Sequence, residues 1–259
     1  MDEQMGAQEV AALLRARRSI RDFRPDPVAP DVIDAVIGDA LSSPSWSNTQ
    51  PYLLAVATGA VRDAMSAALC ERFDAASQAR RLGPLARLGA WKARPSSDLK
   101  VPLDYPADLQ QQRRQTGHGL YQVLGIDRGD RQARDRQMRR NFEFFSAPVV
   151  VFVFVHRGLG HYATLDAGIM LHALMLSAHA RGLGTCAQGA LAVWADPVRS
   201  AFDVPGHYAL LCGVALGHPS DHPVNQYAPA RAAAAERLIP VRTDTMGATE
   251  VDRPARLDP

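Results

Sequence analysis

The chain has 259 residues, of which 47% are hydrophobic and 22% charged, a balance that is ordinary for a globular enzyme. The formal net charge of +2 argues against a nucleic-acid-binding protein, which usually concentrates basic residues on one face. Three widely spaced cysteines, Cys70, Cys186 and Cys212, argue against a disulfide framework and a zinc site. We therefore expect buried free thiols and no metal.

The N-terminal residues Met1–Gln4 lack a basic stretch followed by an apolar one, so we expect no signal peptide. The most apolar segment, residues 163–180, contains Asp166 and His172, and a membrane span rarely tolerates that polar load. The sequence thus predicts a soluble, cytoplasmic protein with a single domain over residues 1–259.

The first part of the chain alternates short helices with polar loops. The spacing of apolar residues predicts an amphipathic helix over 9–18 and a second over 32–41, which Asp31 can cap. A loop over 42–51 with hydroxyl and amide side chains then leads into a strand over 52–57.

Residues 60–145 form an Arg- and Gln-rich helical region interrupted by prolines. Its aromatic residues favour two interpretations: a wall or lid over the active site, or a solvated helical pair packed on the core.

The second half carries the strongest apolar runs. It predicts a strand over 148–155, buried on both faces, and an apolar helix over 163–180 that ends at Gly182. A strand over 207–216 and a short helix over 231–238 follow, and then a polar C-terminal tail over 240–259. Helices mixed with few strands favour the α+β class.

Four segments have residue types suited to a ligand. The first, residues 17–21, places three arginines and a serine within five positions. Guanidinium groups suit a phosphate dianion, or a heteroaromatic ring that becomes anionic on reduction. A solvated basic patch is the ordinary alternative.

The second segment, residues 44–51, has amide side chains that both donate and accept, as the edge of a flavin requires. The third, residues 182–190, has glycines that allow a backbone to approach a planar ligand closely. The fourth is residues 225–231, which end on Arg231, a further candidate for phosphate. Plain turns, a helix C-cap and a surface arginine are the respective alternatives.

The order of these segments resembles the FMN-dependent nitroreductase family. Arg17-Arg18-Ser19-Ile20-Arg21-Asp22-Phe23 resembles the opening signature of that family, and Pro44-Ser45-Trp46-Ser47-Asn48-Thr49-Gln50-Pro51 its second. Gly182-Leu183-Gly184-Thr185-Cys186 with Gln188-Gly189 resembles the third, and Cys212-Gly213-Val214-Ala215-Leu216-Gly217 with Arg231 the last. The resemblance spans residues 13–236. The chain departs from the family at Trp46, where a small residue is common, and in the length of 60–145.

The resemblance implies a nitroreductase-like fold with a central, mostly antiparallel sheet flanked by helices. It implies a homodimer with a long buried interface helix, over 163–180, and FMN bound between the subunits. Ser45, Asn48 and Gln50 would reach the flavin of the other subunit. The residues that the resemblance assigns to FMN are Arg17, Arg18, Ser19, Arg21, Ser45, Asn48, Gln50, Gln188, Gly189 and Arg231.

The implied activity is hydride transfer from NADH or NADPH through FMN N5 to a nitroaromatic or quinone acceptor, with ping-pong kinetics. No protein side chain is then needed as a catalytic acid, base or nucleophile. Two alternatives remain open: a specialised flavin enzyme of the same fold, such as an enone reductase or a biosynthetic dehydrogenase, and a flavin-binding protein without turnover.

Overall fold

The computed structural model describes residues 6–83, 91–101 and 104–240. The chain forms two units, residues 1–228 and residues 229–259, and each is described by itself. In the second unit the predicted helix over 231–238 is reduced to one 3-10 turn, η8 (Ala234–Glu236). No described residue of this unit is buried, and a helix this short is marginal in water without packing. Of the predicted tail over 240–259, residues 241–259 lie outside the described residues.

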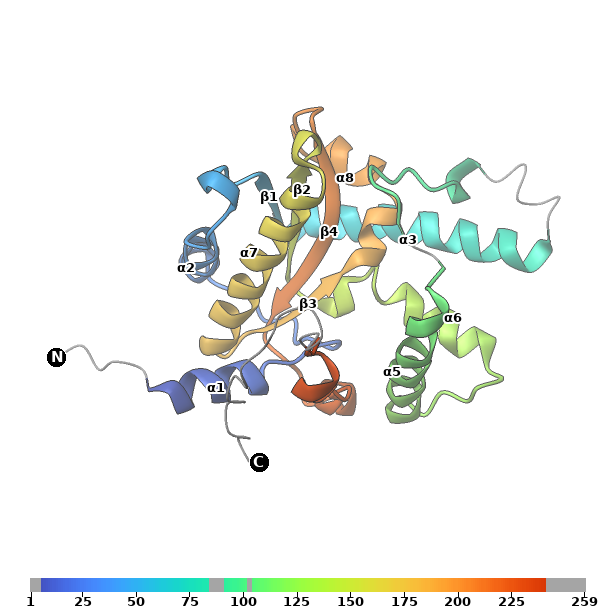
Figure 1. The fold of residues 1–259 in the computed structure, drawn as a ribbon. Coiled ribbons are helices and arrows are strands. Elements are labelled where there is room, and N and C mark those ends of the chain that lie inside the picture. The colour runs from blue at the N-terminus through green and yellow to red at the C-terminus, as the bar shows by residue number, and fades with distance from the viewer. Residues whose placement is uncertain (1–5, 84–90, 102–103, 241–259) are drawn as a thin grey trace. The chain divides into compact units, whose positions relative to one another are not determined.

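A four-stranded antiparallel sheet forms the centre of the first unit (Figure 1). Its strands are β1 (Tyr52–Thr58), β2 (Val149–His156), β3 (Gly184–Gln188) and β4 (Tyr208–Gly217), in the order β1-β2-β4-β3. β2 pairs with β1 and β4, and β3 pairs with β4 at the edge. The α+β class and the central antiparallel sheet predicted from the sequence are confirmed.

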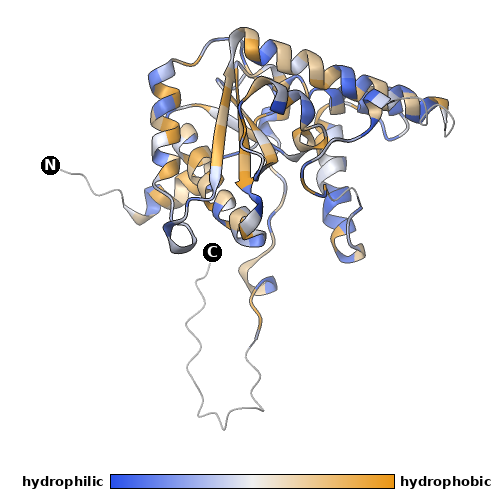
Figure 2. Cartoon of the chain, turned by 90° about the horizontal axis from the view of Figure 1, so that it is seen from above, coloured by the Kyte–Doolittle hydropathy of each residue, from blue (hydrophilic) through white to orange (hydrophobic). Residues whose placement is uncertain are grey.

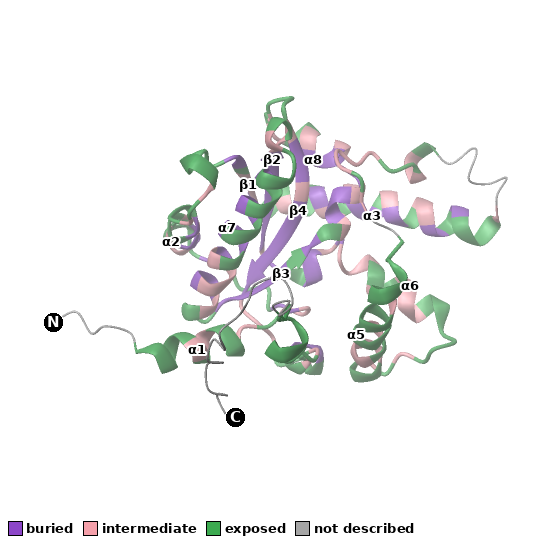
Figure 3. Cartoon of the chain, viewed as in Figure 1, coloured by how far each residue is buried: buried purple, intermediate pink, exposed green. Residues whose placement is uncertain are grey.

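The alternation of side chains along β2 explains why both faces of the sheet are covered. Val150, Phe152 and Phe154 belong to one buried cluster, whereas Val149 and Val151 belong to the other. The whole strand except its last residue is buried (Figure 3), and in Figure 2 the strands carry the hydrophobic colour. Successive side chains of a strand point to opposite faces, so an unbroken apolar run suits a strand between two helical layers.

Helices pack on both faces of this sheet (Figure 1). The helices described in this unit are α1 (Ala7–Ala16), α2 (Pro30–Leu41), α3 (Gly59–Leu82), α5 (Gln110–Val123), α6 (Arg131–Arg139), α7 (His161–Ala180) and α8 (Asp196–Ala201). α2 and α7 contribute to one buried cluster, and α3 and α8 to the other. The described part of 60–145 contains α3, α5 and α6.

The predicted helices over 9–18, 32–41 and 163–180 are present with shifted ends. Asp31 does not cap α2, because Ala29 is the N-cap residue and Pro30 occupies the first helical position. Proline is suited there, since its missing N–H has no partner in that turn anyway. Among the described residues, no helix is long and apolar enough to cross a membrane.

The prediction missed β3. Gly184–Gln188 contains a glycine and a glutamine and follows a helix after a short turn, so its sequence predicts no strand. Its strand conformation comes from pairing with β4, where Gly184 lies opposite Gly217 and Gln188 opposite Gly213. A tertiary contact, and not the local pattern, makes this strand.

Two turns contain non-glycine residues with positive φ. The first has Ser47, Asn48 and Gln50, and the second has Phe144, Phe145 and Ser146. Side chains beyond the Cβ atom disfavour this left-handed region. Both turns adjoin parts of the candidate site.

Candidate functional site

The arginine-rich segment lies beside β3, at one edge of the sheet. The backbone N–H of Ile20 donates to the carbonyl of Thr185 at 3.0 Å, and Ser19 forms a parallel bridge with Thr185. A Cβ atom on Gly184 would lie 2.6 Å from Cγ1 of Ile20. Gly184 is therefore required by protein packing, in contrast to the expectation that its role is to admit a planar ligand.

Asn225, in the 3-10 turn η7 (Pro223–Gln226), fixes the backbone of this segment. Its Oδ1 accepts hydrogen bonds from the N–H groups of Arg21 (2.8 Å) and Asp22 (3.1 Å). Its Nδ2 donates to the carbonyls of Asp22 and Ser220. The sequence predicts only Arg231 as a ligand of this region, because the role of Asn225 follows from the burial of its amide.

Arg17 and Arg18 border a cavity of about 260 Å³. Its lining residues include Arg17, Arg18, His179, Gly182, Thr185, Asn225 and Gln226. Arg18 donates to the carbonyl of Gln226 at 2.8 Å, and Arg21 donates to the carbonyl of Ser19 at 3.2 Å. Neither Arg18 nor Arg21 forms an ion pair with a carboxylate of the described residues. Their charges are available to an anionic ligand.

Cys186 lies behind this cavity with its thiol in the core. Burial raises the pKa of Cys186 to about 11, although the positive charges of Arg21 and Arg17 act in the opposite direction. The thiol is thus protonated at neutral pH and is no nucleophile. All three cysteines are free and buried, as predicted.

Gln188 has a buried amide with one unused acceptor. Its Nε2 donates to the carbonyl of Asn141 at 2.7 Å, whereas its Oε1 finds no donor among the described residues. The adjacent Gly189 faces open space, with nothing within 4 Å of a Cβ built on it. A buried acceptor without a donor is costly, and a ligand with a ring N–H, such as the N3–H of a flavin, would satisfy it.

Ser45, Asn48 and Gln50 form a separate group in and around the 3-10 turn η1 (Trp46–Asn48). Oγ of Ser45 accepts from the N–H of Gln50 at 2.9 Å, and Oδ1 of Asn48 accepts from Nε2 of Gln50 at 3.2 Å. The carboxylate of Asp166, buried on α7, accepts from the N–H of Trp46 at 3.1 and 3.2 Å. The loop is thus held in one shape with its amides exposed.

The two groups lie at opposite edges and opposite ends of the sheet within one chain. The loop precedes Tyr52, which pairs with Val155, whereas Thr185 pairs with Leu216 at the end where Thr58 meets Val149. β1 and β3 are the two edge strands. One copy of the chain therefore does not bring Ser45, Asn48 and Gln50 to its own arginine cluster.

Arg231 belongs to the second unit, where its side chain donates to the carbonyls of Pro229 (2.9 Å) and Ala230 (3.5 Å). Its role toward phosphate stays a prediction. Within the described ranges, no group of three or more His, Cys, Asp or Glu side chains is arranged to hold a metal ion.

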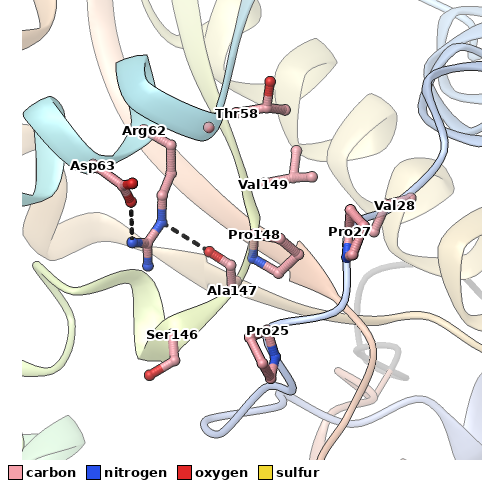
Figure 4. A pocket seen from close by; sticks show the side chains of 11 residues that line it. Pro25, Pro27, Val28, Thr58, Arg62, Asp63, Ser146, Ala147, Pro148 and Val149 are labelled. Atoms are coloured by element: carbon pink, nitrogen blue, oxygen red, sulfur yellow. Dashed lines mark hydrogen bonds and ion pairs between the residues drawn. The ribbon is translucent and has the colours of Figure 1, made fainter.

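A second cavity, of about 320 Å³, lies beside the N-terminal end of α3 (Figure 4). It is lined by Pro25, Pro27, Arg62, Ser146 and Pro148, among others, and contains none of the predicted FMN residues. The guanidinium of Arg62 is already bonded to protein acceptors there. This cavity is therefore a poor candidate for an anionic ligand.

Comparison with known proteins finds similarity along most of the chain. A family model described as the nitroreductase family matches residues 14–218. A 4-nitrobenzoate reductase from Nocardioides sp. is 31% identical over 222 residues, covering 85% of each chain. Another, from Pseudomonas putida, is 31% identical over 211 residues, covering 82% of this chain and 86% of the relative. The FMN-dependent nitroreductase NfnB from Mycobacterium smegmatis, solved in complex with NADPH, has a TM-score of 0.79 at 31% identity, covering 91% of this chain and 99% of that chain.

Proposed function

This chain belongs to the nitroreductase family, and from that premise we propose that it is an NAD(P)H-dependent FMN oxidoreductase that reduces nitroaromatic or quinone acceptors. Relatives that share about a third of its residues are 4-nitrobenzoate reductases and an FMN-dependent nitroreductase solved with NADPH. Nitroaromatic acceptors and NADPH are accordingly the first choices for an assay.

One observation carries the proposal: residues 17–21 lie against β3, and together the two segments are complementary to FMN. The 17–21 segment supplies guanidinium charges without carboxylate partners at Arg18 and Arg21. The 184–189 segment supplies the unused Oε1 of Gln188 and the open space at Gly189. A dianionic phosphate and a planar ring with an N–H donor match these features.

When bound at this site, FMN would supply the hydride-transfer chemistry between NAD(P)H and the acceptor. The chain's own residues bind and orient it. Arg17 and Arg21 lie close enough to the Cys186 thiol to affect its pKa, so their field also reaches a ligand beside β3. A preorganised positive charge stabilises negative charge as it develops nearby. Asn225 keeps Arg21 in place through its backbone N–H.

We propose that the enzyme is a homodimer in which α7 lies at the interface. α7 buries eight residues within its own chain and yet exposes Leu165 (57%) and Ile169 (39%) on its other side. Trp46 contacts Tyr162 of α7 with tilted rings whose centroids lie 4.2 Å apart, and it is itself 53% exposed. Large exposed apolar residues in one region favour a subunit contact. A second copy would also bring Ser45, Asn48 and Gln50 to the partner's flavin.

The decisive experiment is to purify the protein, release its chromophore and follow NAD(P)H oxidation with a nitroarene, a quinone and an enone in turn. We expect FMN, turnover with the nitroarene or quinone, and parallel double-reciprocal plots, because one site serves donor and acceptor in turn. Bound flavin without turnover would identify a carrier, and turnover only with the enone a specialised reductase. A monomer with full flavin content would contradict the dimer.

The arginine cluster can be tested with Arg21→Ala. We expect it to weaken FMN binding by roughly ten- to a hundredfold, which corresponds to the loss of one charge-assisted contact of about 1.5–3 kcal/mol. Arg128→Ala is the matched control, because Arg128 is exposed in the turn between α5 and α6. Arg199 is unsuitable as a control, since it binds Asp98 and the carbonyl of Tyr208 and so supports the fold. Equal FMN affinity in the two variants would refute this assignment.

A further inference from the structure

The turn of Phe144, Phe145 and Ser146 is unusual because three consecutive non-glycine residues have φ of 53°, 54° and 70°. Two of them are buried phenylalanines, at 0% and 2% exposure. Bulky residues avoid this backbone region, and such a conformation persists only where the surroundings enforce it. The contacts around the turn therefore matter more than its local sequence.

Arg62, on the first turn of α3, supplies the strongest of these contacts (Figure 4). Its Nη2 donates to the carbonyl of Glu143 at 2.8 Å and its Nε to that of Ala147 at 2.9 Å. These two carbonyls flank the turn on either side. Nη1 pairs with Asp63 at 2.8 Å, and the guanidinium lies 5.3 Å from the ring centre of Phe144. A planar fork with several donors can span two carbonyls in this way, whereas an ammonium group is a single point.

The same turn contacts the segment after Arg21 directly, and it contacts Gln188 through Asn141, whose carbonyl accepts from the N–H of Phe144 at 3.2 Å. The carbonyl of Phe145 accepts from the N–H of Phe23 at 3.1 Å, two residues after Arg21. Just before the turn, Arg140 forms an ion pair with Asp22 at 2.8 Å. The carbonyl of Asn141 accepts from Nε2 of Gln188 and so determines which way the unused Oε1 of Gln188 points.

We propose that Arg62 is a positioning residue for the flavin site: by clamping the carbonyls of Glu143 and Ala147 it fixes the left-handed turn that orients Gln188 and the segment after Arg21. This inference rests on the proposed function. Arg62 itself belongs to neither segment assigned to FMN, and it acts through the backbone.

The test compares Arg62→Lys and Arg62→Ala with Arg72→Ala. Arg72 is a matched control: it is also on α3, its side chain is 17% exposed like that of Arg62, and it pairs with Asp196 and the carbonyl of Lys92. Arg62→Lys keeps the charge beside Asp63 but loses the fork, so it serves if Arg62→Ala does not fold.

The first readout needs no flavin. In the apoprotein, hydrogen exchange of the Phe23 and Phe145 amides should be at least about tenfold faster in Arg62→Lys, and unchanged in Arg72→Ala. The second readout is FMN. We expect about tenfold weaker binding in the Arg62 variants and a shifted visible spectrum of the bound flavin, with wild-type values in Arg72→Ala.

Wild-type exchange and wild-type FMN affinity in Arg62→Lys would overturn the inference, as would equal weakening by Arg62→Lys and Arg72→Ala. Faster exchange with unchanged FMN affinity and spectrum would show that the turn does not position the site, and would also overturn it. A wild-type protein that binds no FMN would defeat the proposed function and the flavin part of this inference, while the exchange data would still decide whether Arg62 holds the turn.

Discussion

The two turns with left-handed non-glycine residues are stabilised in different ways. Asn48, at φ 55°, represents the exposed turn, and Phe145, at φ 54°, the buried one. Asparagine tolerates this conformation far better than a bulky residue does. Each such residue can cost about 1–3 kcal/mol, so both turns need compensating contacts.

The exposed turn is held mainly by its own side chains. Thr49 Oγ1 donates to the carbonyl of Trp46 at 2.8 Å, and Ser45 Oγ accepts from the N–H of Gln50 at 2.9 Å. Asp166 is the main contact from a distant element. Short polar side chains that bond to neighbouring backbone groups favour turns over regular structure.

The buried turn is held from outside, by Arg62 on α3 and by the N–H of Phe23. Gln188 on β3 bonds to the carbonyl of Asn141, just before the turn. Its own phenylalanines pack in the core, and the ring of Phe144 also lies against the guanidinium of Arg62. Local sequence therefore specifies the exposed turn, whereas the rest of the fold specifies the buried turn.

The largest expected effect is on the buried turn. Phe145→Ala should lower the free energy of unfolding by about 3–5 kcal/mol, because it empties a fully packed position. Phe145→Gly should lose about 1 kcal/mol less than Phe145→Ala, since glycine adopts positive φ without strain. Urea unfolding of the three proteins measures both differences. A glycine variant less stable than the alanine variant would show that the turn is not strained.

The second effect concerns the contact that joins the exposed turn to α7. Asp166→Ala removes the acceptor of the Trp46 N–H, a bond to a charged group that typically contributes about 1.5–3 kcal/mol. We expect the Trp46 amide to exchange roughly ten- to a hundredfold faster, and the amides of the buried turn to stay unchanged.

Asp166→Asn is the control, because its amide oxygen still accepts from the Trp46 N–H; it should exchange like the wild type. Unchanged Trp46 exchange in Asp166→Ala would contradict this prediction. It would mean that the exposed turn depends on its own side chains alone, which would increase the difference between the two turns.

The sequence predicted those elements of the fold that depend on local residue patterns, and it did not predict those that depend on distant contacts. Apolar runs predict β2 and α7, and the spacing of Val32, Ile33 and Val36 predicts α2. Gly184–Gln188 has no such pattern, so the sequence did not predict β3. Residues 231–238 are rich in helix-forming alanines, but they are exposed and form only one 3-10 turn. Local patterns therefore predicted elements that bury their own apolar face, and failed where pairing or packing decides.

The residues of the candidate site also fall into those that the sequence predicted and those that only the structure identifies. The arginine cluster and the loop over 44–51 were predicted as site segments because their residue types are conspicuous. The structure brings Arg17, Arg21 and Gln188 to one edge of the sheet, and their role toward FMN stays a prediction. The sequence did not predict the contacts of Asn225 with the arginine segment, nor those of Arg62, for which we propose a positioning role. An asparagine and an arginine are common surface residues, and only burial and partners distinguish these two.

The smallest expected effect tests whether the exposed turn is specified locally. Asn48→Gly should change the free energy of unfolding by less than about 0.5 kcal/mol, since glycine costs little at φ 55° and the lost amide is exposed. Asn48→Ala should cost about 1 kcal/mol, because alanine lacks both the positive-φ tolerance and the bond from Gln50. FMN affinity should fall in both variants if the proposed dimer is correct, so stability and binding would separate at this position. At Phe145 the glycine variant still loses a core side chain and several kcal/mol, whereas at Asn48 it loses almost none. A glycine variant at position 48 as unstable as the alanine variant would mean that the exposed turn also depends on contacts elsewhere in the fold, and the distinction between the two turns would fail.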